Sequence, residues 1–551
     1  MRRYRTPEIL GWTFFNAIIV IALLLPLGDV LLSVFRDSGG VWRHLAETVL
    51  FRYLSNTAIL AVGVVTTTVL IGVTSAWIVT HCEFPGRSIV QWALILPLAI
   101  PSYLLAYAVT DCFQFSGPVQ TMLRNVFQWE RGDYWFPAVR SLPGAICILS
   151  AGLYPYVYLA CRTALLQIDN AMIQSSRTLG VGMVETFFRV TFPLVRPGVI
   201  AGAMLVLMET LAEFGAVDYC AVDTFATGVY RTWLSHGSLV GAGQLSACLI
   251  VVVSSLLLGQ RFISRNKRVA TNNGAQLEVQ RMQLGTFGKI TASLIVWFPV
   301  LLGFLLPVFI FVEMTLENGD QRAFELLGQL GLNSIQVSLV VAIVCTTLSL
   351  VIISSLRRCP VALNRVIVSG SGLGYAIPGI VIAIGCLSPL FLVEETIADW
   401  SLELFGQDIG FWLTGSIVGL VFGYVCRFVA VSNGMVRSGY DRISLTLDDA
   451  SFVLGRGSLK TLSGVHLPLL SSSILVASLM VFVDSMKELP ITLVLRPFNF
   501  DTLAVRVYQL ASDERLDEAA ASALAIIFVG LIPVFVLSKY VFSQKLNSSP
   551  K

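Results

Sequence analysis

The chain has few charged residues for its length. Only 13% of its 551 residues are Asp, Glu, Lys or Arg, and the formal net charge is +3. Soluble domains carry about 25% charged residues, and a nucleic-acid-binding protein needs a basic surface that this balance does not supply. The composition therefore excludes an ordinary soluble domain and gives no support to a nucleic-acid partner.

Sequence signatures for nucleotides and metals are also missing. No segment reads Gly-x-x-x-x-Gly-Lys-Ser/Thr, and Gly288-Lys289, which comes nearest, has neither the spacing nor the hydroxyl residue. The ten cysteines form no Cys-x-x-Cys pair, and the four histidines are scattered along the chain. We therefore predict no catalytic residue, no firm metal site and no cofactor bound by this chain, so that ATP hydrolysis would have to come from another protein.

Apolar sequence is abundant. Hydrophobic residues make up 55% of the chain, and the mean hydropathy is +0.77. A helix needs about 20 apolar residues to cross a bilayer. Twelve such runs can be placed, near residues 9–34, 55–80, 89–110, 142–166, 197–216, 241–262, 290–312, 333–356, 366–393, 409–432, 470–486 and 518–540. We expect an all-α polytopic membrane protein with about twelve transmembrane helices.

The distribution of basic residues predicts the orientation in the membrane. If the N-terminus is cytoplasmic, 25 of the 37 Lys and Arg residues fall in or beside cytoplasmic segments. Short cytoplasmic loops retain an excess of Lys and Arg. The bias therefore favours cytoplasmic N- and C-termini in a multi-pass protein.

One polar segment occurs twice. Its glycine and its proline recur at the same interval, half the chain length (455 − 180 = 468 − 193 = 275). We call residues 174–193 the first repeat element and residues 449–468 the second. The residues that carry the match are Gln174, Ser175, Ser176, Gly180 and Pro193 in the first and Asp449, Ala450, Ser451, Gly455 and Pro468 in the second.

The repeat extends beyond this segment. Asn56-Thr57 matches Asn333-Ser334, and Ile100-Pro101 matches Ile377-Pro378, in both cases 277 residues later. An even number of spans per half leaves the two halves in the same orientation, as two tandem parallel repeats. We expect an N-terminal half at residues 1–269 (repeat core about 52–262), a cytoplasmic linker at 270–289, and a C-terminal half at 290–551 (repeat core about 329–540).

Each repeat element has the pattern of a helix, a sharp turn and a second helix. The glycine permits a backbone conformation that other residues avoid, and the proline suits the first turn of the next span. Such an element on the membrane face would offer a rigid surface to a cytoplasmic partner. The alternative is an ordinary helix that re-enters the membrane between two spans.

The two elements resemble the EAA motif of ATP-binding-cassette importer permeases, which reads Glu-Ala-Ala, three residues, Gly, nine residues, Ile, one residue, Leu-Pro. The second element is the closer match, with Asp449 in place of the glutamate, whereas the first begins with Gln174. The segments after the fifth span of each half resemble those of ferric-iron permeases with two fused halves. They run from Glu213 to Trp233 and from Lys487 to Ala504.

This resemblance implies a type I importer permease fold in a bacterial inner membrane. It also implies two copies of an ATPase subunit on the cytoplasmic face, with ATP and Mg²⁺ bound there, and a periplasmic or lipid-anchored substrate-binding protein. The docking residues would be those of the two repeat elements. Ferric iron is the implied substrate, but fused permeases for thiamine, phosphonate or another small solute are similar, and the binding protein largely sets specificity.

Four acids are expected inside the membrane, Glu209, Glu213, Asp484 and Glu488. Each half would place its two acids four residues apart and so on one face of a helix. Counting from Pro197 at about 1.5 Å per residue places Glu209 roughly 18 Å along its helix. Charged groups at such depth usually face a bundle interior or a water-filled cavity, so these acids are candidates for the translocation path. The structural alternative is that they pair with Arg231 and Arg506 and hold a gate together.

Functions of other classes remain open at this point. A secondary transporter driven by an ion gradient would also have an internal repeat, but it would need no soluble ATPase. A membrane-embedded enzyme would need clustered His, Asp or Cys residues at one face, and the sequence shows no such cluster.

Overall fold

The computed structural model describes residues 6–130, 132–168, 175–176, 178–264, 281–318, 321–406 and 412–543. Within these ranges the regular structure is helical except for two short strands, β1 (Cys82–Glu83) and β2 (Met282–Gln283), which pair in parallel. In the described part of the chain, eleven helices are long and apolar enough to cross a membrane, or twelve if one bent pair is one span. The prediction of an all-α protein with about twelve spans is confirmed.

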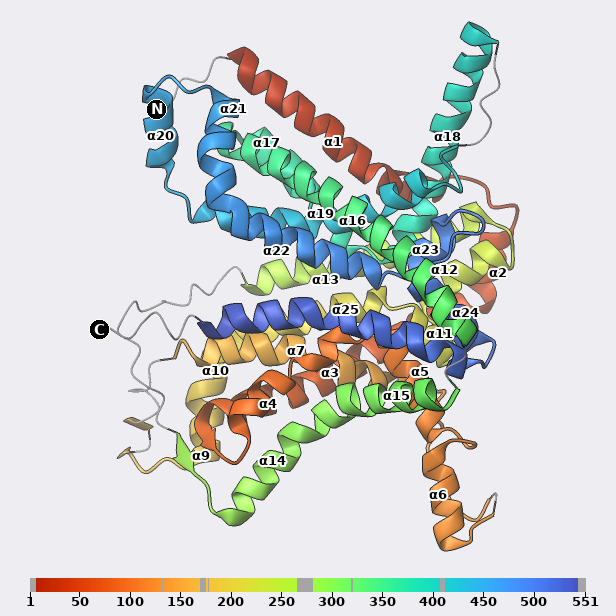
Figure 1. Ribbon diagram of the computed structural model, residues 1–551, viewed down its shortest axis with the longest axis vertical. Helices are drawn as coiled ribbons and strands as arrows, with labels where there is room; N and C mark the ends of the chain where they lie inside the picture. The colour runs from red at the N-terminus through yellow and green to blue at the C-terminus, as the bar shows by residue number, and fades with distance from the viewer. Residues whose placement is uncertain are drawn as a thin grey trace. The chain divides into compact units, whose positions relative to one another are not determined.

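Contacts divide the chain into two compact units, and each draws on separate parts of the sequence (Figure 1). Most of the first repeat core, as far as Gly228, lies in unit 2, and most of the second, as far as Arg506, lies in unit 1. Unit 1 contains Met1–His44, Val229–Cys248 and Phe324–Arg506, and unit 2 contains Leu45–Gly228, Leu249–Ala323 and Val507–Lys551.

Unit 2 is built around three helices that pack on one another, α3 (Leu50–His81), α7 (Leu142–Leu165) and α10 (Phe192–Ala212) (Figure 1). Helix α25 (Leu516–Ser543) packs against α15 (Leu306–Asn318), which follows α14 (Thr286–Val300). Long helices are the expected solution because a helix satisfies its backbone hydrogen bonds within itself, where lipid offers no partner. The smaller elements in or entering this unit are α4 (Arg87–Ala93), η1 (Leu96–Ala99), α5 (Ser102–Phe113), α6 (Pro118–Phe127), α9 (Met183–Thr186), η2 (Phe187–Thr191), α11 (Gly215–Tyr219) and η3 (Leu301–Leu305).

In unit 1, α1 (Thr6–Ser33) packs against α17 (Ala362–Gly370) and α18 (Gly379–Phe405), and α19 (Ile417–Asp441) packs against α22 (Leu467–Met486). Thus the first span of the chain packs in the same unit as the second core. Other elements here are α16 (Gln321–Arg358), η4 (Gly374–Ala376), α20 (Leu445–Val453), α21 (Ser458–Thr461), η5 (Leu462–His466) and α23 (Pro490–Leu495). The chain passes between the units within α2 (Val41–Thr48), α12 (Phe225–Leu234), α13 (Leu239–Ser264), α16 and α24 (Leu503–Ser512).

The third span of each half is broken. Both breaks lie at the matched Ile-Pro pairs: Pro101 and Pro378 have extended backbones, with ψ of 142° and 139°. A residue before proline avoids the helical region, and proline has no N–H to continue the ladder. In unit 2 the two parts, Arg87–Ala99 and Ser102–Phe127, are bent by 99°. The spans expected near 89–110 and 366–393 therefore each contain a break at the proline.

The other matched pair, Asn56-Thr57 and Asn333-Ser334, makes the same contacts in both cores. Asn56 Nδ2 donates to the Asp223 carbonyl at 3.0 Å, and Asn333 Nδ2 donates to the Asp501 carbonyl at 3.1 Å. The neighbouring hydroxyl also accepts a backbone N–H: Thr57 Oγ1 accepts that of Phe225 at 3.2 Å, and Ser334 Oγ accepts that of Leu503 at 2.9 Å. In each half, these contacts hold the start of the second span, α3 or α16, against the loop before α12 or α24.

Candidate functional site

The second repeat element forms a helix, a turn and a second helix within unit 1. Helix α20 ends before Gly455, whose φ is +71°, and α21 follows and continues through one π-helical turn into α22. The N–H of Arg456 donates to the Ser451 carbonyl at 3.1 Å, closing the helix end. A left-handed residue followed by such a bond is a standard helix stop, and glycine adopts it without strain.

The first repeat element has the same backbone geometry within unit 2. Gly180 has φ of +80°, and the N–H of Val181 donates to the Ser176 carbonyl at 3.2 Å. Helix α9 and one π-helical turn then lead into α10, which has Pro193 in its first turn, as α22 has Pro468. Gln174 lies outside the described residues.

A pair of buried hydroxyl groups holds each element together. Ser451 Oγ lies 2.8 Å from Thr461 Oγ1, and Ser176 Oγ donates to Thr186 Oγ1 at 3.2 Å. Both serines are buried, at 4% and 8% exposure. They therefore fix the angle between the two helices of their own element, although we had predicted them as residues that contact a partner.

The outer surface of each element is apolar beside the glycine. Leu179 is 82% exposed, and its counterpart Leu454 is 77% exposed with Val453 beside it at 83%. Exposed apolar side chains at matched positions are typical of an interaction surface. The other residues that the resemblance predicted as docking residues are also exposed: Ser175, Gly180, Pro193, Asp449, Ala450, Gly455 and Pro468.

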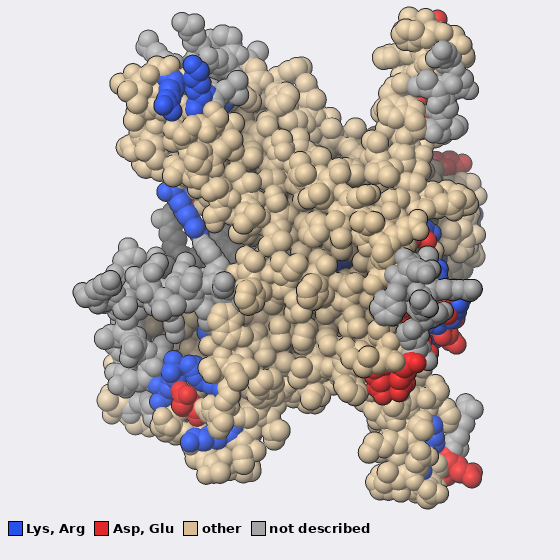
Figure 2. Space-filling view, viewed as in Figure 1, with Lys and Arg blue, Asp and Glu red and all other residues tan. Residues whose placement is uncertain are grey.

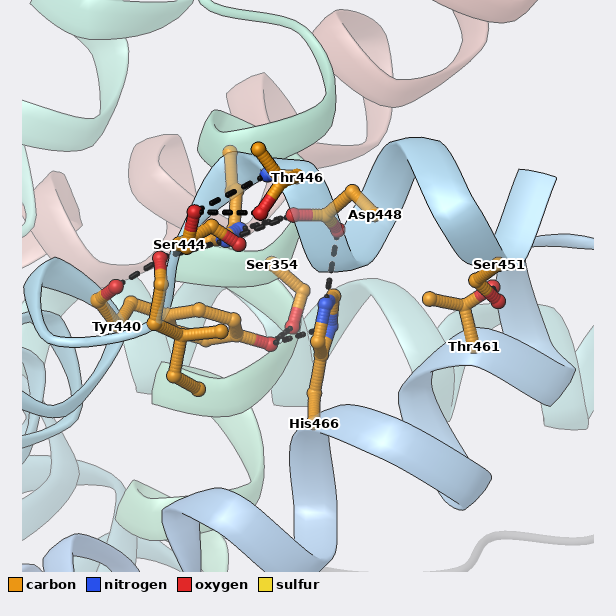
Figure 3. Close-up of polar contacts among 10 residues, drawn as sticks. Ser354, Tyr440, Ser444, Thr446, Asp448, Ser451, Thr461 and His466 are labelled. Carbon is orange, nitrogen blue, oxygen red and sulfur yellow. Dashed lines mark hydrogen bonds and ion pairs between the residues drawn. The ribbon is translucent and has the colours of Figure 1, made fainter. Parts of the chain in front are cut away.

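A polar network anchors the second element to the rest of unit 1 (Figure 3). Asp448 accepts from the Arg357 guanidinium at 2.6 Å and from His466 Nε2 at 2.8 Å. Tyr440 Oη lies 2.7 Å from Ser354 Oγ and 3.4 Å from His466 Nδ1. His466 is 2% exposed, so it lies in the packed interior of unit 1 and not on the outer surface of the element.

Sequence reasoning missed Asp448 and Arg357. Asp448 stands directly before the matched segment, and Arg357 ends a predicted span, where a basic residue is unremarkable. Only the fold brings them together, because they are 91 residues apart in sequence.

The four predicted acids do not lie as the helical spacing implied. Helix α10 ends at Ala212 and α22 ends at Met486, so Glu213 and Glu488 follow their helices. The prediction that each pair shares one helix face is therefore wrong. Glu209, Glu213 and Asp484 are half-buried, whereas Glu488 is 7% exposed.

Glu488 forms a buried ion pair that the sequence did not predict. Its Oε1 accepts from Arg427 Nη1 at 3.0 Å, and both side chains are about nine-tenths buried. Gly379 makes room for the pair, because a Cβ there would lie 2.0 Å from Arg427 Nη1 and 2.5 Å from Glu488 Oε1. Arg427 lies inside α19, within the span expected near residues 409–432. An arginine within a predicted span was the signal available in the sequence.

The first core has the acid without this arginine. Ser141 and Ser416 cap α7 and α19 at equivalent places, and in that register Gly152 stands where Arg427 stands in the second core. Glu213 Oε1 accepts the Ala216 N–H at 2.9 Å, as Glu488 Oε1 accepts the Ile491 N–H at 3.3 Å. The acid thus caps a short helix in both cores, and in the second core it also forms the buried ion pair with Arg427.

Arg231 and Arg506 are not structurally equivalent. The paired contacts of Asn56 and Asn333 set a local register of 278 residues (501 − 223), which aligns Arg506 with Gly228. The interval of 275 residues that separates the two arginines is therefore not the register of this part of the fold. Arg231 lies in α12 and Arg506 in α24, and both are half-buried.

Basic residues lie at the end of each unit that carries its repeat element. In unit 2 Lys and Arg are on the surface near α9, and in unit 1 they are on the surface near α20 and α21 (Figure 2). Among the described residues, no group of three or more His, Cys, Asp or Glu side chains is arranged to hold a metal ion.

Comparison with known proteins gives matches of one kind. A family model described as binding-protein-dependent transport system inner membrane component matches residues 68–269. A molybdenum transport system permease of Haemophilus influenzae is 30% identical over 187 residues, which is 33% of this chain and 78% of the relative.

Two other relatives match along almost the whole chain. A ferric-iron transport system permease of Haemophilus influenzae is 25% identical over 544 residues, covering 96% of this chain and 99% of the relative. A ferric transport system permease of Actinobacillus pleuropneumoniae is 23% identical over 544 residues, covering 94% of this chain and 75% of the relative.

Proposed function

Because this chain belongs to the family of binding-protein-dependent transport system inner membrane components, we propose that it is the translocation subunit of an importer driven by separate ATPase subunits. The two repeat elements are the docking sites for two ATPase copies on the cytoplasmic face. The observation that carries this proposal is the duplication of one rigid helix-turn-helix, with the same hydroxyl pair and the same glycine turn.

The geometry suits the transmission of force. Each element is closed by its own hydrogen bonds, and the second is tied to α16 and α19 through Arg357 and Tyr440. An element fixed in this way moves with its unit and does not unfold when it is pulled. ATP-driven closure of the ATPase pair would then switch the permease from inward-open to outward-open, and no covalent chemistry would occur in this chain.

The orientation follows from the same elements. Docking to a cytoplasmic ATPase requires the repeat elements and the chain termini to be cytoplasmic, in agreement with the Lys and Arg bias. The substrate-binding protein would then dock at the opposite, periplasmic face. The sequence halves at 1–269 and 290–551, joined by the linker at 270–289, would be the products of one duplication.

Ferric iron is the substrate that we propose. The ferric permeases match along more than nine-tenths of this chain, whereas the molybdenum permease matches only about a third of it. Carboxylates are hard ligands suited to a highly charged cation, and a conduit needs contacts weak enough to release it. Glu209 and Asp484 remain candidates for such contacts, because each lies within its long helix and is half-buried.

The buried Glu488 has a different role in this account. An acid that already pairs with Arg427 is stabilised in place and is poorly suited to bind and release a passing ion. We assign Glu488 and its counterpart Glu213 to holding the short helices that follow α22 and α10.

The test is reconstitution of the permease in nanodiscs with its ATPase and its binding protein. We expect the ferric-loaded binding protein to stimulate ATP hydrolysis several-fold over the empty one, and molybdate or sulfate to give no stimulation. Equal stimulation by loaded and empty binding protein would overturn the proposed cargo. Failure of the ATPase to associate would overturn the whole assembly.

The path residues need their own test. Glu209→Gln with Asp484→Gln should slow iron uptake while ATPase association stays unchanged, and Glu213→Gln should serve as the matched control. Uptake at the unmodified rate in the double variant would remove both acids from the path.

A further inference from the structure

Helix α6 has an apolar stripe that faces away from its unit. Met122 is 68% exposed and Val126 is 62% exposed. The spacing of four residues places them on one side of the helix. A soluble helix turns such a stripe toward a core, but here it faces outward.

The opposite side of α6 is polar and faces the protein. Gln120 is 7% exposed. Its Nε2 donates to the Phe113 carbonyl at 2.8 Å, and its Oε1 accepts from Tyr134 at 2.7 Å. Arg124 donates to the Phe115 carbonyl at 2.9 Å. The helix therefore has the reverse of the arrangement that water favours.

In unit 2, α6 lies at the end of the spans that is far from the first repeat element. The chain runs from α6 to the start of α7, and the end of α7 leads toward that element. The chain bends by 99° between Arg87–Ala99 and Ser102–Phe127, and α6 runs across the direction of α7 and α10 (Figure 1). In the space-filling view the arm formed by α6 shows an uncharged side toward the flank of the spans and its charged atoms on the other side (Figure 2).

Aromatic residues cluster at the end of α6 and directly after it. The rings of Phe127 and Trp129 stack at 4.6 Å, Trp129 stacks on Tyr134 at 5.3 Å, and Trp135 is 85% exposed. Tryptophan and tyrosine concentrate at the boundary between lipid and water, where an apolar ring and a polar group are both satisfied.

We propose that α6 is an interfacial membrane helix, with its stripe in the lipid at the boundary between headgroups and acyl chains and its polar side toward the aqueous phase and the protein. The occupant is lipid because the stripe continues an apolar surface: α15, which packs against α5 directly before α6, exposes Phe309 at 64% and Leu316 at 80%. An amphipathic helix lying in the membrane plane presents this division of faces.

This inference assigns to the membrane a segment that sequence reasoning left as an exterior loop. It does not depend on the cargo. Its consequence is that α6 resists displacement of α5 along the membrane normal, since any such movement would draw the stripe out of lipid.

The test places a photo-crosslinking amino acid in the full chain, in nanodiscs with the ATPase and the binding protein present. Met122→p-benzoylphenylalanine is the probe. Gln128, exposed and polar at the C-terminal end of the same helix, is the matched control. We expect lipid adducts at Met122 at least fivefold more abundant than at Gln128.

Three outcomes would overturn the proposal. They are adducts of Met122 with the binding protein, adducts with a second copy of this chain, and equal lipid adducts at both positions. A second measurement uses Met122→Asp and Gln128→Asp: we expect only the first to lower the midpoint of thermal unfolding in nanodiscs, and equal midpoints would contradict the lipid contact.

Discussion

The two glycine turns make the docking proposal quantitative. Gly455 has φ of +71°, and a Cβ at this position would meet no atom within 4 Å. Gly455→Ala therefore introduces backbone strain and no clash, and a left-handed alanine costs about 1–2 kcal/mol. If that strain is relieved by reshaping the turn, the fraction of elements in the docking conformation falls, and the apparent affinity for the ATPase falls with it. The expected loss is about 5- to 30-fold.

The chain supplies a matched control two residues away. Gly457 also has open space around its Cβ but not a positive φ, so Gly457→Ala should leave ATPase binding unchanged. The assay is titration of the detergent-purified variants with the ATPase subunit, with thermal unfolding measured in parallel to show that the permease stays folded. Equal losses for Gly455→Ala and Gly457→Ala, or full affinity for Gly455→Ala, would refute the reasoning. The pair Gly180→Ala and Gly182→Ala repeats the experiment in the first element.

Other expected outcomes follow from the buried ion pairs. Asp448→Ala removes the acceptor shared by a guanidinium and the His466 imidazole, and each hydrogen bond to a charged group contributes about 1.5–3 kcal/mol. We expect faster amide hydrogen exchange in the second repeat element and unchanged exchange in the first, and unchanged exchange in both would contradict the anchoring role. Glu488→Gln leaves Arg427 buried without its carboxylate, which costs about 3–5 kcal/mol. Its unfolding midpoint should fall well below that of Glu213→Gln, and equal midpoints would count against the pair as a stabilising contact.

Much of the architecture could be predicted because the length of an apolar run and the spacing of a repeat can be read directly from the sequence. Runs of about 20 apolar residues have few alternatives to a membrane-spanning helix. The match of Asn56-Thr57 with Asn333-Ser334 predicted equivalence, and the structure gives both pairs the same two hydrogen bonds. The glycine at each turn predicted a positive φ because few other residues adopt it.

The rest depends on contacts between distant segments or on where helices end. The break at Pro101 and the end of α10 at Ala212 are decided by backbone geometry that a hydropathy pattern does not record. Asp448 and Arg357 meet only after the spans pack. The second core has Arg427 where the first core has Gly152. A search for repeats looks for matching residues, so it does not detect such a difference.

The most direct measurement concerns the exposed leucines of the two elements. With a photo-crosslinking amino acid at Leu454, or at Leu179, the assembled importer should give an adduct between the permease and the ATPase subunit. The yield should change when ATP is bound, because the two ATPase copies close. Adducts with lipid or with the binding protein at both positions, and none with the ATPase, would contradict the claim that the duplicated elements connect this permease to its source of energy.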